Sequence, residues 1–304
     1  MIFQKGLLDI FVLAMLWGPS FLFCKVAVRD VSPLTIVAIR ILLGTLFLFC
    51  FIKLKNLRFS RDPKLWMHCF ILGIFANGLP FICYTYAVIY IPTSLSALIN
   101  GTVPILTVIL ANLFLSDERL NWNRAIGVLL GMTGFLVIFL PSLLGNGSEQ
   151  GFDKTGIVLS LLGSSCYGIA AVYARKYVKN APAYTSPCIQ LLLSLIYLIP
   201  LAFIFETPSD LLLASKETWA SIIALGLFGT TLGYIMYYRI VRSQTATSLS
   251  MVTYLIPIVG TTLGLLFLNE TVGIHFCIAA LLILSGILVV NGVIRLPTRV
   301  LAKG

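Results

Sequence analysis

The side chains in this sequence that could recognise a solute are aromatic, hydroxyl and amide groups set within long apolar runs. A Trp or Tyr ring can stack on a flat solute while it offers one polar atom, and Asn, Ser and Thr add hydrogen-bonding groups. Because these residues cluster beside prolines and glycines within the runs, we expect them to line one cavity. The candidate substrate-binding residues are Trp17, Ser20, Asn77, Tyr84, Asn100, Thr102, Tyr167, Tyr234, Tyr237, Thr253 and Tyr254.

Some aromatic residues have another explanation, because Trp and Tyr also form belts at the two surfaces of a membrane. That explanation suits Tyr90, Tyr177 and Trp219, which lie near the ends of runs, better than it suits Trp17 or Tyr167. The rings in the middle of runs therefore remain the candidates for solute contact.

Arg40 is a charge in the middle of an apolar run, and no acidic residue occupies the interior of any run. An ionisable side chain at that depth costs about 3 kcal/mol on insertion scales, so it needs a reason. Arg40 could attract a carboxylate or phosphate on a solute, or it could hold two helices together by donating to carbonyls. Glu118 and Glu270 follow apolar runs directly and are interpreted as helix-end anchors.

Catalytic and metal chemistry lack the residues that they require. The two histidines, His68 and His275, lie near the ends of runs, and the sequence has no metal-ligand spacing, no GxSxG motif and no phosphate-binding loop. Its seven cysteines lie within apolar runs and form no CxxC pair. We expect no enzyme activity, no catalytic residue, no metal and no cofactor.

The composition predicts an integral membrane protein. The apolar fraction is 59%, the charged fraction is 11% and the mean hydropathy is +1.01, values outside the range of soluble proteins. A net charge of +10 could indicate nucleic acid, but the basic residues fill short gaps between apolar runs. The expected partners are therefore the lipid bilayer and a small-molecule substrate, with no nucleic acid, and the protein is expected to be a monomer or a homodimer.

Ten apolar runs have about the length that crosses a ~30 Å hydrocarbon core. They are expected at 7–28, 33–52, 65–89, 93–115, 123–141, 155–175, 184–205, 217–238, 246–268 and 274–293. The first run has no small-residue cleavage site after it and is interpreted as a retained helix. Most of the 21 Lys and Arg residues fall on one side, which predicts a multi-pass protein of the inner (cytoplasmic) membrane with both termini cytoplasmic.

The two halves of the chain repeat one another. The segment 94–118 resembles 247–270, so that Pro104 pairs with Pro257 and Glu118 with Glu270. Other pairs are Trp66 with Trp219, Gly73 with Gly226, Tyr84 with Tyr237, Trp17 with Tyr167 and Arg40 with Gln190. We predict an all-α fold of ten transmembrane helices in two five-helix repeats, residues 1–145 and 151–296. Because five is odd, the second repeat enters the membrane from the opposite face and the topology is inverted.

Several runs are expected to be interrupted near their middles. Pro104 and Pro257 each remove a backbone donor and push away a carbonyl four residues earlier, so both are candidate helix breaks. Further breaks are expected at 18–20, 77–80, 164–168 and 229–231. In contrast, small residues such as Gly127 and Gly131 favour close packing of the fifth and tenth runs at the periphery, against each other or against a second copy.

With these motifs in their order and duplicated, the chain resembles the EamA-type members of the drug/metabolite transporter superfamily over essentially its whole length. The resemblance rests on Trp17-Gly18, Arg40, Pro104 and Glu118 in the first half, and on Tyr167-Gly168, Pro257, Glu270 and Gly286 in the second. It implies a central cavity lined mainly by the first, third, fourth, sixth, eighth and ninth helices. It also implies that Arg40, at a position that is often basic in the family, has a structural role in preference to direct contact with the substrate.

The function predicted from these observations is secondary transport of a small polar metabolite, an amino acid or an amino-acid derivative, across the inner membrane by alternating access. An alternative cargo is a nucleoside-like metabolite such as S-adenosylmethionine or a purine, and an alternative class is a non-transporting membrane scaffold. Since no run interior holds a carboxylate, facilitation or exchange is favoured over proton-driven export.

Overall fold

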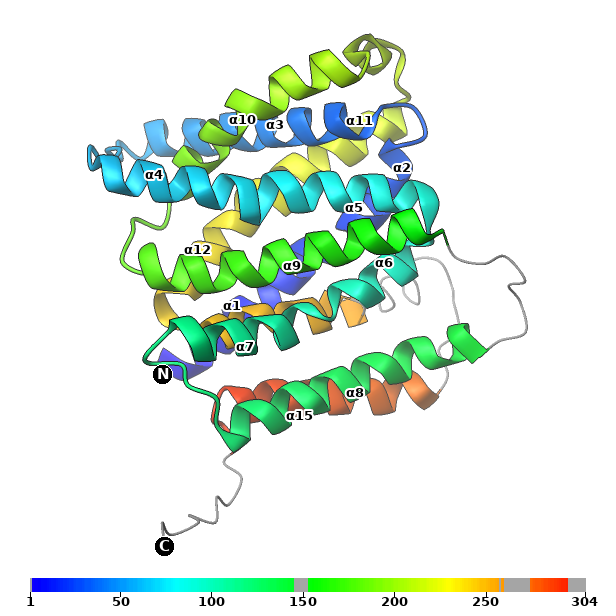
Figure 1. The fold of residues 1–304 in the computed structure, drawn as a ribbon. Helices are drawn as coiled ribbons and strands as arrows, with labels where there is room; N and C mark the ends of the chain where they lie inside the picture. Colours follow the sequence, from blue (N-terminus) through cyan, green and yellow to red (C-terminus); the bar gives the residue numbers. More distant parts are fainter. Residues whose placement is uncertain (1, 145–152, 257, 260–273, 295–304) are drawn as a thin grey trace, which may run out of the picture.

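The computed structural model describes residues 2–144, 153–256, 258–259 and 274–294, and within those ranges it is helical with no strand (Figure 1). Two π-helical segments, η1 (Gly73–Gly78) and η3 (Leu225–Leu232), and a 3-10 helix η2 (Pro208–Leu213) join the α-helices. The α-helices are α1 (Ile2–Trp17), α2 (Ser20–Ala27), α3 (Pro33–Leu54), α4 (Pro63–Leu72), α5 (Leu79–Tyr90), α6 (Thr93–Asn100), α7 (Val103–Phe114), α8 (Trp122–Leu144), α9 (Lys154–Tyr177), α10 (Thr185–Phe205), α11 (Lys216–Ala224), α12 (Gly233–Ser243), α13 (Ala246–Ser250) and α15 (Ile274–Val290).

Six helical stretches in the described part of the chain are long and apolar enough to cross a membrane. They are Leu7–Ala27, Pro33–Leu54, Pro63–Tyr90, Lys154–Tyr177, Thr185–Phe205 and Lys216–Ser243. Shorter apolar helices occupy Val103–Phe114, Trp122–Val137, Ala246–Ile256 and Cys277–Val290. Large apolar side chains such as Leu129, Ile196, Phe203 and Leu281 are exposed on the outside. Apolar helices with an apolar exterior fit a multi-pass membrane protein, in which lipid is the surrounding solvent.

The predicted interruptions lie where prolines, glycines and small polar residues meet. A turn at Gly18 and Pro19 separates α1 from α2, and a turn at residues 101–102 separates α6 from α7, which then begins at Val103 and Pro104. The break predicted at 77–80 spans the end of the π-helical segment η1 and the start of α5, and the break predicted at 229–231 lies within η3. Pro257 lies outside the described residues.

The break predicted at residues 164–168 is wrong, because α9 runs without interruption from Lys154 to Tyr177. The hydroxyl of Ser164 donates to the carbonyl of Ser160 at 2.9 Å, and that of Ser165 donates to Leu161 at 2.8 Å. Serine hydroxyls that bond to the preceding turn are satisfied inside the helix and do not need to end it.

The π-helical segments offer backbone carbonyls to side chains of other helices. In η1, Gly73 accepts from the hydroxyl of Tyr197 at 2.8 Å, and Ala76 accepts from the hydroxyl of Tyr234. In η3, Gly229 accepts from Nε1 of Trp17 at 2.9 Å. A π-helical turn interrupts the regular backbone hydrogen bonds of an α-helix, and in lipid the carbonyls left without a partner must find one within the protein. These side chains supply them.

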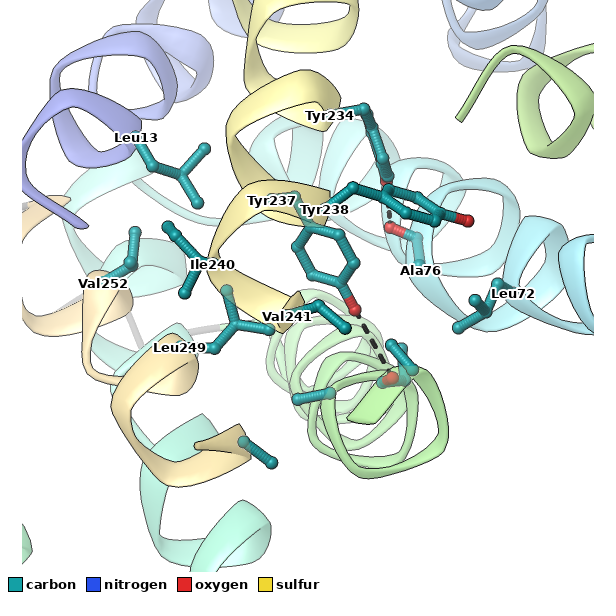
Figure 2. Packing of buried hydrophobic residues seen from close by; sticks show 14 of the residues in the cluster. Leu13, Leu72, Ala76, Tyr234, Tyr237, Tyr238, Ile240, Val241, Leu249 and Val252 are labelled. Carbon is teal, nitrogen blue, oxygen red and sulfur yellow. Dashed lines mark hydrogen bonds between the residues drawn. The ribbon is translucent and has the colours of Figure 1, made fainter. Parts of the chain in front are cut away.

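The π-helical segments also receive a long helix from the other half of the chain: α3 packs against η3, and α10 packs against η1. Figure 2 shows how α12, which continues from η3, fills the space between other helices with Tyr234, Tyr237 and Tyr238. The hydroxyl of Tyr234 reaches toward Ala76, while Leu13 of α1 lies on the other side of α12. This core holds together helices that are far apart in the sequence.

The fifth and tenth predicted helices, α8 and α15, lie side by side at one edge of the bundle (Figure 1). A Cβ added at Gly127 would lie 2.8 Å from the carbonyl oxygen of Gly286, and one added at Gly286 would lie 2.6 Å from that of Gly127. The two backbones therefore touch where glycine leaves room, as in close helix pairs in membranes. The small-residue spacing serves this contact between α8 and α15.

Two carboxylates bind the N-termini of helices that are far from them in the sequence. Glu206, at the end of α10, accepts from the backbone N–H groups of Leu34 and Thr35 at 2.9 and 2.8 Å. Glu118, after α7, accepts from the N–H of Ala246 at 2.7 Å and pairs with Arg175 at 3.3 Å. The first N–H groups of a helix lack intrahelical partners and carry partial positive charge, so a carboxylate there is doubly favourable. Glu118 is thus a helix-end anchor, whereas Glu270 lies outside the described residues.

Candidate functional site

A cavity of about 80 Å³ lies among helices from both halves of the chain. Since one ordered water needs about 10–15 Å³ by this measure, the cavity has room for several waters or for a small solute. It is lined by Trp17, Ser20, Phe21, Cys24, Arg40, Phe81, Tyr84, Thr85, Asn100, Val103, Tyr167, Ala171, Tyr237, Leu249, Ser250, Thr253 and Ile256. Apart from Arg40, these residues lie in the first, third, fourth, sixth, eighth and ninth predicted helices, which are the six that the family resemblance implies. Arg40 lies in the second predicted helix.

Three rings form a stacked row along one wall. Tyr167 of α9 lies between Trp17 and Tyr84, with ring centroids 6.3 and 5.8 Å away and planes inclined by 22° and 20°. Phe21 meets Tyr84 edge-on at 5.4 Å. Offset and edge-to-face contacts are the favoured geometries between aromatic rings. Trp17 and Tyr167, which the sequence repeat aligned with each other, are therefore direct neighbours in space.

Tyr84 approaches this wall closely because α9 carries Gly163 beneath it. A Cβ at Gly163 would lie 2.8 Å from Cε2 of Tyr84, which is too short for an ordinary contact. The Tyr84 hydroxyl lies 2.9 Å from Oδ1 of Asn100, to which it donates, and 2.7 Å from Oγ of Ser164. The carbonyl side of the Asn100 amide is thus occupied, and the described residues offer no acceptor to its NH₂ group.

Arg40 lies in the cavity wall with 3% of its surface exposed. Its Nε donates to Oγ1 of Thr230 at 3.2 Å, and the guanidinium carbon lies 3.8 Å from the ring centroid of Phe81. Thr230 in turn donates to the carbonyl of Leu225 at 2.9 Å. The hydroxyl that accepts from Arg40 is therefore oriented by the π-helical segment, and the cation stacks on an aromatic face.

The predicted site residues divide into two groups by position. Those in the cavity wall are Trp17, Ser20, Tyr84, Asn100, Tyr167, Tyr237, Thr253 and Arg40. Four others lie outside it: Asn77, Thr102, Tyr234 and Tyr254. Tyr254 packs against Phe135 of α8, 5.8 Å between centroids, and Tyr234 points to Ala76 of η1. Thr102 bonds back to Ile99 at 2.8 Å in the turn that precedes Pro104.

Asn77 belongs to a closed polar network between η1 and α10. It donates to Oγ of Ser194 at 2.7 Å and accepts from Nε2 of Gln190 at 2.6 Å. Gln190 also accepts from the hydroxyl of Tyr238 at 2.7 Å. All four side chains are fully buried. A satisfied buried network of this kind fixes the packing of two helices.

Nine lining residues were not expected from the sequence: Phe21, Cys24, Phe81, Thr85, Val103, Ala171, Leu249, Ser250 and Ile256. Most are apolar or small and are unremarkable within a membrane helix. The one available signal is helical spacing, because Phe21 and Cys24 follow Trp17 at intervals of four and three residues and so share its face. Likewise, Leu249 and Ser250 share a face with Thr253 and Ile256.

The cavity wall carries positive charge and no negative charge among the described residues. Arg40 is the cation in the wall, and no Asp or Glu is among the described residues that line the cavity. The described part of the chain also has no group of three His, Cys, Asp or Glu side chains placed to hold a metal ion. The arrangement can therefore offer ring faces, hydrogen bonds and a cation to a bound solute.

Comparison with known proteins gives a consistent result. The model of the EamA-like transporter family matches residues 4–140 and 154–292. An uncharacterized transporter, YoaV, of Bacillus subtilis is 24% identical over 93% of this chain and 95% of its own length. An uncharacterized transporter of Archaeoglobus fulgidus is 26% identical over 90% of this chain and 94% of its own length.

More distant similarities extend to plants and to solved structures. A WAT1-related chloroplastic protein of Arabidopsis thaliana is 24% identical over 90% of this chain and 66% of its own length. One crystal structure matches with a TM-score of 0.77 at 20% identity, over 95% of this chain and 97% of that chain. At that identity the likeness is one of fold.

Proposed function

The chain belongs to the EamA-like transporter family, and from that premise we propose that it is a secondary transporter of a small polar metabolite. The leading cargo is an amino acid or an amino-acid derivative, bound in the central cavity and moved by alternating access. The single observation that carries the proposal is this buried cavity, to which helices of both halves contribute polar atoms.

The architecture that we propose for this activity has ten transmembrane helices in two inverted repeats, residues 1–145 and 151–296. The reciprocal packing of α3 on η3 and of α10 on η1 supports it, because each half places a long helix against the π-helical segment of the other. Inverted repeats permit one half to rock against the other around a fixed site near the bilayer midplane. The excess of basic residues on one side supports an inner membrane location with cytoplasmic termini.

In this proposal, the carboxylates of Glu118 and Glu206 stabilise one conformation of the transporter by binding the N-termini of helices in the other half of the chain. Glu118 fastens the start of α13, and Glu206 fastens the start of α3. Rocking of one half requires at least one of these contacts to open and the water-exposed helix end to be solvated. Because the described cavity wall has no carboxylate to carry a proton, facilitation or exchange of solutes is the proposed mode.

The proposal is tested with the full chain reconstituted in liposomes. Vesicles loaded with a mixture of amino acids, keto acids and nucleosides are assayed for counterflow of each labelled solute. Wild type should exchange at least one solute, and Asn100→Leu, which fills the cavity and removes an amide, should lose exchange while it keeps its unfolding temperature within a few degrees.

The matched control places the same large apolar side chain elsewhere. Ser165→Leu lies on α9 at a residue that does not line the cavity, so it should retain exchange. A wild-type protein that is folded but exchanges no solute in the mixture would favour a non-transporting scaffold. Equal loss of exchange in Ser165→Leu would remove the cavity assignment.

A further inference from the structure

We infer that the central cavity takes an organic oxyanion, a carboxylate or a phosphate, carried on a planar apolar body, and that Arg40 binds the oxyanion. The inference rests on the proposed transport function and names the class of solute for the same site. It excludes solutes with a net positive charge. Three features of the described residues carry it: the unused donors of Arg40, the absence of a counter-ion in the wall, and the aromatic lining.

The first feature is the hydrogen bonding of Arg40. A guanidinium has five N–H donors, and in the described residues those of Arg40 meet one oxygen acceptor, Oγ1 of Thr230, through Nε. The thiol of Cys24 is also hydrogen-bonded to the guanidinium, but sulfur is a weak acceptor that an oxyanion can replace. Because Nε is held by Thr230, the two terminal nitrogens are the donors that remain. They have the fork geometry that matches two oxygens of a carboxylate or phosphate.

Two other arginines, the partly buried Arg175 and the exposed Arg239, are both paired with carboxylates. Arg175 pairs with Asp117 at 3.0 Å and with Glu118 at 3.3 Å, and Arg239 pairs with Asp9 at 3.1 Å. Arg40 has no such carboxylate among the described residues, although it is more deeply buried than either. Contact with the face of Phe81 offsets about 0.5–2 kcal/mol. That is less than the penalty for an ion taken out of water, so the guanidinium is left to be matched by a ligand.

Space is kept open beside those terminal nitrogens. A Cβ at Gly229 would lie 3.3 Å from Nη2 of Arg40 and 3.1 Å from Oγ of Ser20. Any larger residue at position 229 would therefore press on both groups. The glycine allows Ser20 and Arg40 to face the same part of the cavity, where a hydroxyl and a guanidinium can donate to one oxyanion.

The second feature is the charge balance of the wall. Among the described lining residues there is a cation and no carboxylate, and most of the other lining residues are apolar or aromatic. Charges interact more strongly in such a medium than in water, so an amine would be repelled and an oxyanion attracted. A zwitterion such as a free amino acid places its carboxylate at Arg40, with its ammonium left to carbonyls and ring faces.

The third feature is the shape and chemistry of the rest of the wall. Six of the lining residues are aromatic: Trp17, Phe21, Phe81, Tyr84, Tyr167 and Tyr237. Rings favour contact with flat apolar bodies, and Asn100 leaves its NH₂ group free to donate to an acceptor on the solute. A planar body with one oxyanion uses all of these groups, whereas a flexible sugar or a polyamine does not.

The test measures binding of single-ring probes that differ in charge, with the full chain purified in detergent. The probes are phenylacetate, phenyl phosphate, phenylalanine, 2-phenylethanol and phenethylamine. Phenylacetate or phenyl phosphate should raise the unfolding temperature and bind in calorimetry, phenylalanine should bind more weakly, and phenethylamine should not bind. The two oxyanion probes distinguish a carboxylate site from a phosphate site. Counterflow of the same probes in liposomes gives the transport readout.

Variants locate the effect at Arg40. Arg40→Gln should weaken oxyanion binding by about ten- to a hundredfold, the loss expected for one or two hydrogen bonds from a charged group. Arg40→Lys should lose less because it keeps the charge. The matched control is Lys25→Gln, which removes a cation from a neighbouring helix, keeps a donor for the carbonyl of Val88, and lies outside the cavity wall. It should bind the probes as wild type does.

A second variant keeps the inference testable if Arg40→Gln does not fold. Asn100→Asp retains the acceptor for Tyr84 and adds a negative charge to the wall, so oxyanion binding should fall at least about tenfold. The inference is overturned if phenethylamine binds wild type as well as phenylacetate does, or if both variants bind oxyanions like wild type. If wild type exchanges metabolites from a broad mixture but ignores oxyanions, transport stands and the inference fails. If it exchanges nothing, the proposed function itself fails.

Discussion

Two contacts occupy matching places in the two halves of this chain and have opposite characters. On one side Arg40 of α3 meets Thr230 of η3, and on the other Gln190 of α10 meets Asn77 of η1. The sequence repeat aligns Arg40 with Gln190, and each contact joins a long helix of one half to a π-helical segment of the other. The first contact borders the cavity, whereas the second is a closed network in which Ser194 completes the hydrogen bonding.

The two contacts differ in whether their polar groups are fully hydrogen-bonded, and we propose that one serves packing and the other serves recognition of a solute. The amides of Gln190 and Asn77 satisfy each other, so that contact is neutral and stabilises the structure by itself. Arg40 brings a charge that Thr230 and Phe81 compensate only in part. A group that is left with free donors in a cavity can be satisfied by a solute, whereas a completed network has nothing to offer one. We therefore propose that the contact at Arg40 serves recognition of the solute and that the contact at Asn77 serves packing.

The largest expected effect comes from opening the closed network. Asn77→Leu removes the acceptor at 2.6 Å from Nε2 of Gln190 and the donor to Oγ of Ser194, and each buried hydrogen bond that is lost in this way costs about 1–3 kcal/mol. The free energy of unfolding should fall by about 2–4 kcal/mol, measured by denaturant titration in detergent. Thr230→Val, at the matching place, should cost about 1 kcal/mol, because Arg40, which loses one hydrogen bond, lines the cavity and can bind water there.

These two results are read together. Equal destabilisation by Asn77→Leu and Thr230→Val would show that both contacts serve packing alone. Oxyanion binding is measured for the same two variants. Thr230→Val releases Nε of Arg40 and should weaken oxyanion binding, whereas Asn77→Leu should leave binding by the folded protein unchanged.

A smaller effect on stability and binding is expected when the hydroxyl of either Tyr84 or Tyr238 is removed. The hydroxyl of Tyr84 bonds with Asn100 beside the cavity, and that of Tyr238 bonds with Gln190 in the closed network. Removal of either hydroxyl costs about 0.5–1.5 kcal/mol of stability. Tyr84→Phe should in addition weaken solute binding by about tenfold because the Asn100 amide is free to turn. Calorimetry that finds weaker binding in Tyr238→Phe than in Tyr84→Phe would reverse the assignment of the two regions.

The smallest effect concerns the helices that carry the two π-helical segments, because they begin differently. Asp62 caps the start of α4 within its own loop, whereas Asp30 reaches across to bond with Ser215 and Thr218 at the start of α11. These hydrogen bonds lower the pKa of Asp30 from its ordinary 3.8 to about 2. A lowered pKa means that the folded state favours the ionised carboxylate.

The sign of the pH dependence follows from that shift. The contribution of Asp30 to stability is present above its unfolded pKa and is lost as the pH falls from about 4 toward about 2. Asp30→Asn should therefore unfold at a slightly lower temperature than wild type near neutral pH, with the difference vanishing at the acid end. A difference that grows as the pH falls would contradict the role given to Asp30.

Much of this arrangement could be predicted from the sequence, because length and hydropathy dominate in a membrane. The run expected at 33–52 is the helix Pro33–Leu54, and the run expected at 155–175 is Lys154–Tyr177. Trp17 and Tyr167, which the repeat aligns, were both expected to line the cavity, and they do. These features depend on local composition and on duplication, both of which can be read from one chain.

Side-chain direction could not be predicted in the same way. Tyr234 and Tyr237 are three residues apart, yet the hydroxyl of one bonds to η1 and the ring of the other lines the cavity. The partner of Asn77 is a residue more than a hundred positions away, and hydropathy carries no information on such pairs. The break expected near Ser164 failed because back-bonding of a hydroxyl inside a helix leaves no mark in the sequence.

The most direct test of the account compares the chemical accessibility of two serines, one in each region. Ser20 lies in the cavity wall, and Ser194 lies in the closed network. In a transport-competent background without other cysteines, Ser20→Cys and Ser194→Cys are treated in liposomes with a small anionic methanethiosulfonate, with and without phenylacetate. Ser20→Cys should be modified, phenylacetate should protect it, and Ser194→Cys should not be modified. Modification of both cysteines at the same rate, without protection, would contradict the assignment of the two regions.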